Sequence, residues 1–128
     1  MSTGERDLER LLATMDPQVR AGEFVYVSVD DPHAAAALDA HATVREDEGL
    51  CAVIDREAAD AHDLPYDFVA AWITLTVHSA LDAVGLTAAV ATRLTEAGIS
   101  CNVVAGLRHD HLLVPADRAD EALAALRQ

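Results

Sequence analysis

The residues best suited to bind a ligand lie in a short turn, Val84–Thr87, directly before a helical pattern. The first amides of a helix lack partners within the helix, and the helix dipole favours an anion beside them. Gly85 lets the backbone approach a bound group closely. We therefore predict that the amides of this turn, Leu86 included, bind a ligand carboxylate, and that Asp82 pairs with the ligand ammonium. In the alternative interpretation, Gly85 only makes the turn, Thr87 satisfies a free amide, and Asp82 caps the loop.

A second binding candidate lies on the extended segment that follows the helical pattern. The side-chain amide of Asn102 both donates and accepts hydrogen bonds, as a ligand with a carboxylate and an ammonium requires. We predict that Asn102 and the adjacent Val103 contact the ligand; the alternative role of Asn102 is cross-strand hydrogen bonding on an open sheet face. Alternation along the strands predicts that one helix-free face holds several polar side chains: Thr74, Thr76, His78, Ser100, Asn102 and His111.

The histidines offer the one pattern that resembles a metal site. His109 and His111 flank Asp110, with His78 on a neighbouring segment, but no Cys or Glu completes a tetrahedral ligand set at a recognisable spacing. We predict solvated hairpin histidines, no metal and no cofactor, with a site at these three histidines as the alternative.

Signatures of catalysis are missing from the sequence. It contains no nucleophile elbow, phosphate loop or dinucleotide-binding glycine turn. His78 and Ser79 are neighbours on an extended segment and point to opposite faces, so they cannot act as base and nucleophile. We therefore expect no catalytic residues and no enzymatic activity.

The elements that position the turn follow a recognisable order. Alternation predicts a strand at Trp72–His78, a helix that ends at Ala97, and strands at Ile99–Leu107 and His111–Val114. This order of strand, helix, strand and strand is most of one half of a ferredoxin-like split βαβ unit. An amphipathic helix at Asp117–Leu126 completes it.

The first half of the chain repeats this order in a reduced form. Its predicted elements are a strand at Glu23–Val29, a short helix at His33–Ala40, a hairpin of Thr43–Asp47 with Leu50–Ile54, and a helix at Arg56–His62. We infer an internal duplication with its boundary near Asp67. Residues 1–67 then form a degenerate unit with a leading helix at Arg6–Met15, and residues 68–128 form the second unit. The segment Phe68–His78 is long for one strand, so we expect it to close the first sheet and open the second.

The second half resembles the ACT domain. Its turn Val84–Thr87, its helix end Leu94–Ala97 and the following Gly98–Val103 match the family order: a turn ending in Gly, a helix ending Leu-x-x-x-Gly-Ile, and a strand that often contains Asn. The whole chain is similar to small tandem-ACT proteins, although Val84 stands where many members have Pro. The resemblance implies an α+β fold of two ferredoxin-like βαββαβ units in tandem, with antiparallel sheets and helices on one face. It also implies a regulatory module that binds an amino acid or related metabolite, often at an interface between ACT units.

Composition limits the partners of the chain. The net charge is −13 and every basic residue is Arg, so this acidic surface repels nucleic acid and anionic membranes. No apolar run reaches the ~20 residues of a membrane helix, and the polar stretch Met1–Arg10 is unlike a signal peptide. We expect a cytoplasmic homodimer whose ligand stabilises the assembled form. The alternative is an oligomerisation or protein-interaction scaffold without a ligand.

Overall fold

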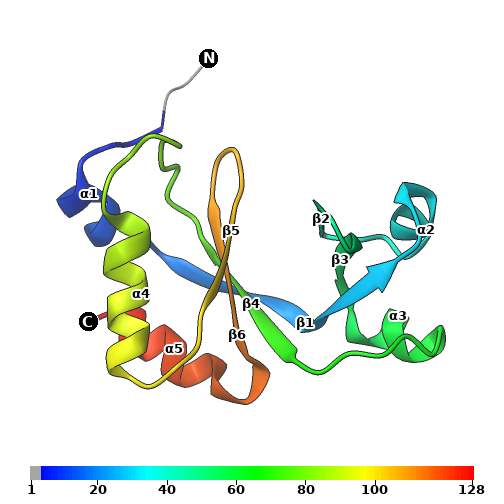
Figure 1. Ribbon diagram of the computed structural model, residues 1–128. Helices are drawn as coiled ribbons and strands as arrows, with labels where there is room; N and C mark the ends of the chain where they lie inside the picture. Colours follow the sequence, from blue (N-terminus) through cyan, green and yellow to red (C-terminus); the bar gives the residue numbers. More distant parts are fainter. Residues whose placement is uncertain (1–3) are drawn as a thin grey trace. The chain divides into compact units, whose positions relative to one another are not determined.

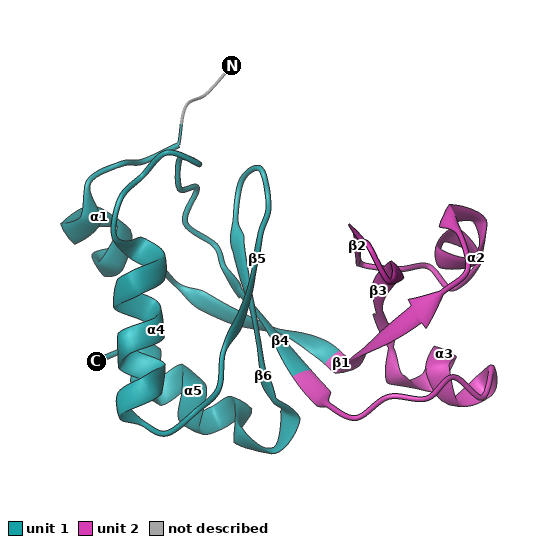
Figure 2. Ribbon diagram, in the orientation of Figure 1, with its two compact units in different colours: residues 1–21, 71–128 teal, residues 22–70 magenta. Residues whose placement is uncertain are grey.

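The computed structural model describes residues 4–128 and divides them into two compact units (Figures 1 and 2). Unit 1 comprises the chain up to Ala21 together with residues 71–128, and unit 2 comprises residues 22–70. Residues 1–3, which belong to the polar N-terminal stretch considered above, lie outside the described residues. None of the helices in residues 4–128 is long and apolar enough to cross a membrane.

Unit 2 has a three-stranded antiparallel arrangement in the order β2-β3-β1. Its elements are the second part of β1 (Pro17–Val29), α2 (Pro32–Ala37), β2 (Ala42–Glu46), β3 (Gly49–Asp55), α3 (Arg56–Ala61) and the first residues of β4 (Val69–Leu75). In the register of β1 with β3, Phe24 lies opposite Asp55 and Val29 lies opposite Leu50. The predicted hairpin around Gly49 is confirmed, because Glu46 of β2 lies opposite this residue.

Unit 1 contains the longer helices, and its strand order is β1-β4-β6-β5. Its elements are α1 (Leu8–Ala13), the first part of β1, most of β4, α4 (Leu86–Glu96), β5 (Asn102–Ala105), β6 (Asp110–Pro115), a 3₁₀ turn (Ala116–Arg118) and α5 (Ala119–Leu126). Both units therefore contain the order strand, helix, strand, strand and helix, which confirms the predicted ferredoxin-like α+β class.

Two strands contribute to both units. β1 starts in unit 1 and passes into unit 2 at Gly22, and β4 starts in unit 2 and passes into unit 1 at Ala71. The sequence predicted this double role for Phe68–His78 but not for β1. The leading helix was expected to belong with residues up to Asp67. It belongs to unit 1 instead, where Leu11 and Met15 are buried in the core.

Each unit has its own apolar core. The core of unit 1 contains the inward side chains of α4 (Leu86, Val90 and Leu94) and those of β4 (Ile73 and Leu75), as the alternation predicts. The core of unit 2 is smaller and is built from valine, alanine and one isoleucine: Val25, Val27, Val29, Ala35, Ala52, Ile54 and Ala59. Unit 2 is thus the smaller of the two units, and its helix α2 has only six residues.

Several strand limits differ from the sequence prediction. β1 begins at Pro17 rather than Glu23, because Gly22 takes a left-handed φ of +97° and lets the strand continue. β4 ends at Leu75, where the next amide donates to the carbonyl of Met15 (3.0 Å). β5 is also shorter, because the Ile99 amide donates to the Leu94 carbonyl at the end of α4 (2.9 Å).

Candidate functional site

The predicted ligand-binding turn precedes the N-terminus of α4. Gly85 is the N-cap residue with φ +104° and ψ −17°, and no side chain caps this helix. Two other helices are capped: the carboxylate of Asp7 accepts a hydrogen bond from the Glu9 amide in α1, and Asp31 accepts one from the Ala34 amide in α2 (2.9 Å). The first amides of α4 therefore have no side-chain acceptor, and an incoming carboxylate can take that place.

The side chains around this turn combine apolar surface with one acid. Leu81 and Val84 are 69% and 84% exposed. Leu86 is buried in the core of unit 1, so only its backbone amide is available to a ligand. Thr87 is exposed. The turn therefore offers backbone donors beside two exposed aliphatic side chains.

The N-terminal segment of the chain runs along this turn. The Glu5 amide donates to the His78 carbonyl (2.8 Å), and the Glu5 carbonyl accepts from the Ala80 amide (2.9 Å). Asp82, which is 71% exposed, forms an ion pair with Arg6 (2.9 Å). Asp82 is therefore already paired, and a ligand ammonium would compete with Arg6 for it.

The helix α1 also contacts the turn. A Cβ atom placed on Gly85 would lie 3.1 Å from Cδ2 of Leu8, so glycine is favoured here by this tight contact as well as by its left-handed φ. The Glu5 carboxylate fixes the segment before α1, since it accepts hydrogen bonds from the amides of Asp7 (2.9 Å) and Arg6 (3.0 Å). These bonds lower the pKa of Glu5.

The other two predicted binding residues lie on the edge strand β5. Asn102 lies opposite Leu113 and Val103 lies opposite Leu112, and both predicted residues are exposed. Leu112 belongs to the core of unit 1, so Val103 faces the helices and Asn102 faces the helix-free side. No hydrogen bond joins either residue to the turn within residues 4–128.

The helix-free face of unit 1 holds a hydrogen-bonded group of side chains. Nδ1 of His111 lies 3.0 Å from Oγ1 of Thr74 and 3.2 Å from Nε1 of Trp72. The guanidinium of Arg20 lies over the Trp72 ring, 4.2 Å from its centroid. Burial and the positive charge of Arg20 lower the pKa of His111. Alternation predicted that Thr74 and His111 share this face, whereas the register that brings Arg20 to Trp72 was not foreseen.

Two of the three candidate metal ligands, His78 and His109, lie near each other, and the third, His111, contacts other side chains. The rings of His78 and His109 are 6.4 Å apart, and Nδ1 of His109 lies 3.2 Å from the Val77 carbonyl. His111 contacts Trp72 and Thr74 through its Nδ1 atom, as described above. In the part of the chain that the structure describes, no three His, Cys, Asp or Glu side chains are grouped closely enough to hold a metal ion.

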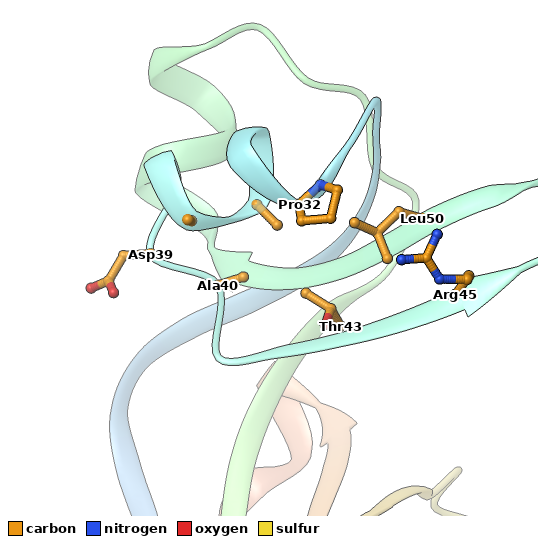
Figure 3. A pocket seen from close by; sticks show the side chains of 8 residues that line it. Pro32, Asp39, Ala40, Thr43, Arg45 and Leu50 are labelled. Carbon is orange, nitrogen blue, oxygen red and sulfur yellow. The ribbon is translucent and has the colours of Figure 1, made fainter.

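Unit 2 contains a pocket that the sequence reasoning did not find. It lies between α2 and the strands β2 and β3 and has a volume of about 510 Å³, within the usual range of ligand sites. Figure 3 shows Arg45 beside Leu50 at one end and Asp39 at the other, with the Asp39 carboxylate turned away from the other lining side chains. The lining residues are Pro32, Ala35, Ala36, Asp39, Ala40, Thr43, Arg45 and Leu50. The run of alanines in the short helix α2 could have indicated this pocket in the sequence, because small side chains leave space between a helix and a sheet.

These observations define an α+β protein of two ferredoxin-like units, each with its own core. An ACT domain model matches residues 3–71, and a second ACT domain model matches residues 68–128. The chain therefore belongs to the ACT domain family, a group of small-molecule-binding regulatory modules. No protein with a curated description matches it.

Solved structures agree with this assignment. A Vibrio cholerae protein of unknown function, described as a possible transport protein, is 48% identical; the match covers 93% of this chain and 92% of that one, with a TM-score of 0.85. An Agrobacterium tumefaciens protein is 22% identical over 86% of this chain and 84% of that one (TM-score 0.65). The ligand-free regulatory subunit of aspartate kinase from Thermus thermophilus is 12% identical, and the match covers 88% of this chain and 94% of that one (TM-score 0.60). The last two similarities establish the shared fold.

Proposed function

We propose that this chain is a regulatory module that binds an amino acid at the turn between β4 and α4 of unit 1. The observation that supports it most strongly is the uncapped N-terminus of α4 behind the left-handed Gly85. Family membership supports the regulatory role, and the same fold is used by a regulatory subunit of aspartate kinase. The proposal assigns binding only and no catalytic residue.

In the proposed complex the ligand carboxylate accepts hydrogen bonds from the first amides of α4, at Leu86 and Thr87. The ligand ammonium pairs with Asp82 in place of Arg6, and an aliphatic ligand side chain covers Val84. Asn102 and Val103 remain predicted contacts, and Asn102 would have to reach the ligand from the helix-free side. Binding that favours one assembled form shifts the population toward that form, which is the regulatory output.

The test is thermal unfolding of the whole chain against a panel of amino acids. A ligand at one hundred times its Kd adds about 2.7 kcal/mol to the free energy of unfolding, which raises Tm by several degrees. Two variants then locate the site. Gly85→Asp places a carboxylate at the proposed carboxylate position, and Gly85→Asn is its uncharged match, similar in size and tolerant of a left-handed φ.

We expect Gly85→Asp to abolish the ligand-induced rise in Tm and Gly85→Asn to retain part of it. An equal response of the two variants and the unsubstituted chain would contradict binding at this turn. A second test uses the desamino analogue of the ligand, which lacks the ammonium group. We expect the unsubstituted chain to bind this analogue more weakly than the amino acid. We expect the Asp82→Asn variant to bind the two compounds with similar affinity.

We further propose that the chain forms a homodimer through an edge strand. Exposed valines on the two edge strands support this: Val44 of β2 is 57% exposed and Val103 of β5 is 36% exposed. Unpaired edges with apolar side chains are sites of strand addition. Light scattering after size exclusion measures the mass, and Val44→Lys and Val103→Lys test each edge. A dimer that no amino acid stabilises would favour the ligand-free scaffold instead.

A further inference from the structure

The pocket in unit 2 exists because the first helix of that unit is short and its side chains are small. α2 has six residues, Pro32–Ala37, and four of them are alanines. The corresponding helix of unit 1, α4, has eleven residues and fills the space above its sheet with Leu86, Val90 and Leu94. In unit 2 the pocket of about 510 Å³ lies beside the short helix, and most of the residues that line it are exposed. A second pocket of about 360 Å³ includes Ala34 and Ala37 of the same helix.

The apolar part of the pocket is formed by α2 and by the segment that follows it. Pro32, Ala35 and Ala36 line it from the helix, Ala40 lines it from the turn, and Leu50 lines it from β3. None of these side chains has a polar atom, so they favour an aliphatic group.

The polar part of the pocket is formed by β2 (Ala42–Glu46) and by Asp39, whose carboxylate is turned away from the other lining side chains in Figure 3. Thr43 and Arg45 are two residues apart on this strand and therefore project from the same face. Arg45 lies directly opposite Leu50 in the register of β2 with β3, and Figure 3 shows its guanidinium beside the Leu50 side chain. A cation and a hydroxyl thus adjoin the aliphatic wall.

Arg45 has no acidic partner in the described part of the chain, although the protein is strongly acidic. No hydrogen bond or ion pair to its guanidinium is present within residues 4–128. The next residue on the strand, Glu46, projects from the opposite face. The guanidinium has the planar pair of donors that matches a carboxylate, so it is free to bind one.

We propose that this pocket is a second ligand site, specific for a small aliphatic carboxylate. Arg45 pairs with the carboxylate through two N–H donors, Thr43 donates its hydroxyl to the same group, and the aliphatic chain lies against Ala36, Ala40 and Leu50. The site belongs to unit 2 alone and is independent of the turn proposed above for unit 1.

The probe is sodium 3-methylbutanoate, titrated into the ¹⁵N-labelled full chain and followed by amide chemical shifts. We expect saturable shifts at residues 32–50. Arg45→Gln is expected to weaken binding about tenfold or more, because a charge-assisted hydrogen bond is lost. Ala36→Leu fills the pocket and is expected to weaken binding by a similar factor. Arg108→Gln makes the same charge change at an exposed residue of unit 1 and is expected to leave the affinity unchanged.

Two further probes separate the carboxylate from the aliphatic chain. 3-Methylbutylamine and 3-methylbutanol have the same chain, and both are expected to bind at least tenfold more weakly. The proposal is overturned if the carboxylate shifts no amide of residues 32–50, if Arg45→Gln binds as tightly as the unsubstituted chain, or if the amine binds equally well. Gly85→Asp is expected to leave this affinity unchanged, so failure here and failure of the amino-acid site are distinguishable.

Discussion

Nε1 of Trp72 lies 3.2 Å from Nδ1 of His111. An indole N–H can only donate, and two acceptors lie 3.2 Å from it, Nδ1 of His111 and Oγ1 of Thr74; when it donates to Nδ1, the proton of a neutral His111 is on Nε2. The hydroxyl of Thr74, 3.0 Å from the same Nδ1, can donate to it as well. The lowered pKa of His111 favours its neutral form in the folded chain, and a proton on Nδ1 would face the indole N–H of Trp72.

This relationship predicts a loss of stability in mild acid. Burial, first, and the charge of Arg20, second, lower the pKa of His111 from its ordinary value of 6.5. The unfolded chain then binds a proton more readily than the folded chain. The contribution of His111 to the free energy of unfolding is complete above pH 6.5 and decreases as the pH falls below it. Urea unfolding at pH 7.5 and 5.5 measures this.

His111→Asn is the matched variant for this measurement. Its side-chain oxygen retains an acceptor near the position of Nδ1 but does not titrate. We expect the variant to lose less stability than the unsubstituted chain between pH 7.5 and 5.5. Equal losses would show that His111 contributes nothing to the pH dependence.

Glycine substitutions should separate backbone strain from a steric contact. Gly98 has φ +71° with nothing within 4 Å of an added Cβ, whereas an added Cβ on Gly85 would lie 3.1 Å from Leu8. A left-handed non-glycine residue costs about 1 kcal/mol, so Gly98→Ala is expected to lower the free energy of unfolding by this amount. Gly85→Ala is expected to cost about 1 to 2 kcal/mol, and Leu8→Ala should reduce that difference in a double-mutant cycle. Identical costs at both glycines, with or without Leu8, would argue against the contact.

An arginine from the 3₁₀ turn after β6 donates to carbonyl groups at the end of α4. Nη1 of Arg118 donates to the Gly98 carbonyl (2.6 Å), and Nη2 donates to the Ala97 carbonyl (3.2 Å) and to Glu121 (2.7 Å). Such a cation stabilises the last carbonyls of a helix. Arg118→Gln should lower the urea midpoint, and Arg118→Lys should lower it less, because Lys keeps the charge without the fork of donors. A midpoint unchanged by Arg118→Gln would show that the cap does not contribute.

The two units are expected to unfold together. The chain has one tryptophan, Trp72 in unit 1, and two tyrosines, Tyr26 and Tyr66 in unit 2, so each unit has an intrinsic optical probe. Leu94→Ala leaves a cavity in the core of unit 1 and is expected to cost about 2 to 5 kcal/mol. Since β1 and β4 belong to both units, both signals should shift by the same amount. A tyrosine transition that stays in place while the tryptophan transition moves would show that the units unfold separately.

Local patterns predicted the elements better than their assignment to units. Gly85 before a helical repeat and Gly49 between two short strands were sufficient to place the turn and the hairpin. The division of the chain was not accessible in this way, because it depends on which core buries Leu11 and Met15. The stacking of Arg20 on Trp72 and the pocket at Arg45 depend on strand register and helix length. These are tertiary properties that alternation along a single segment does not encode.

The passage of β1 and β4 between the units has a consequence for inheritance. The two family matches meet near residue 70, but a gene cut at that point would separate most of unit 1 from α1 and from the first part of β1, which belong to the same unit. The second half of the gene alone therefore does not encode a complete unit 1, so it cannot be moved to another gene without the segment that encodes residues up to Ala21.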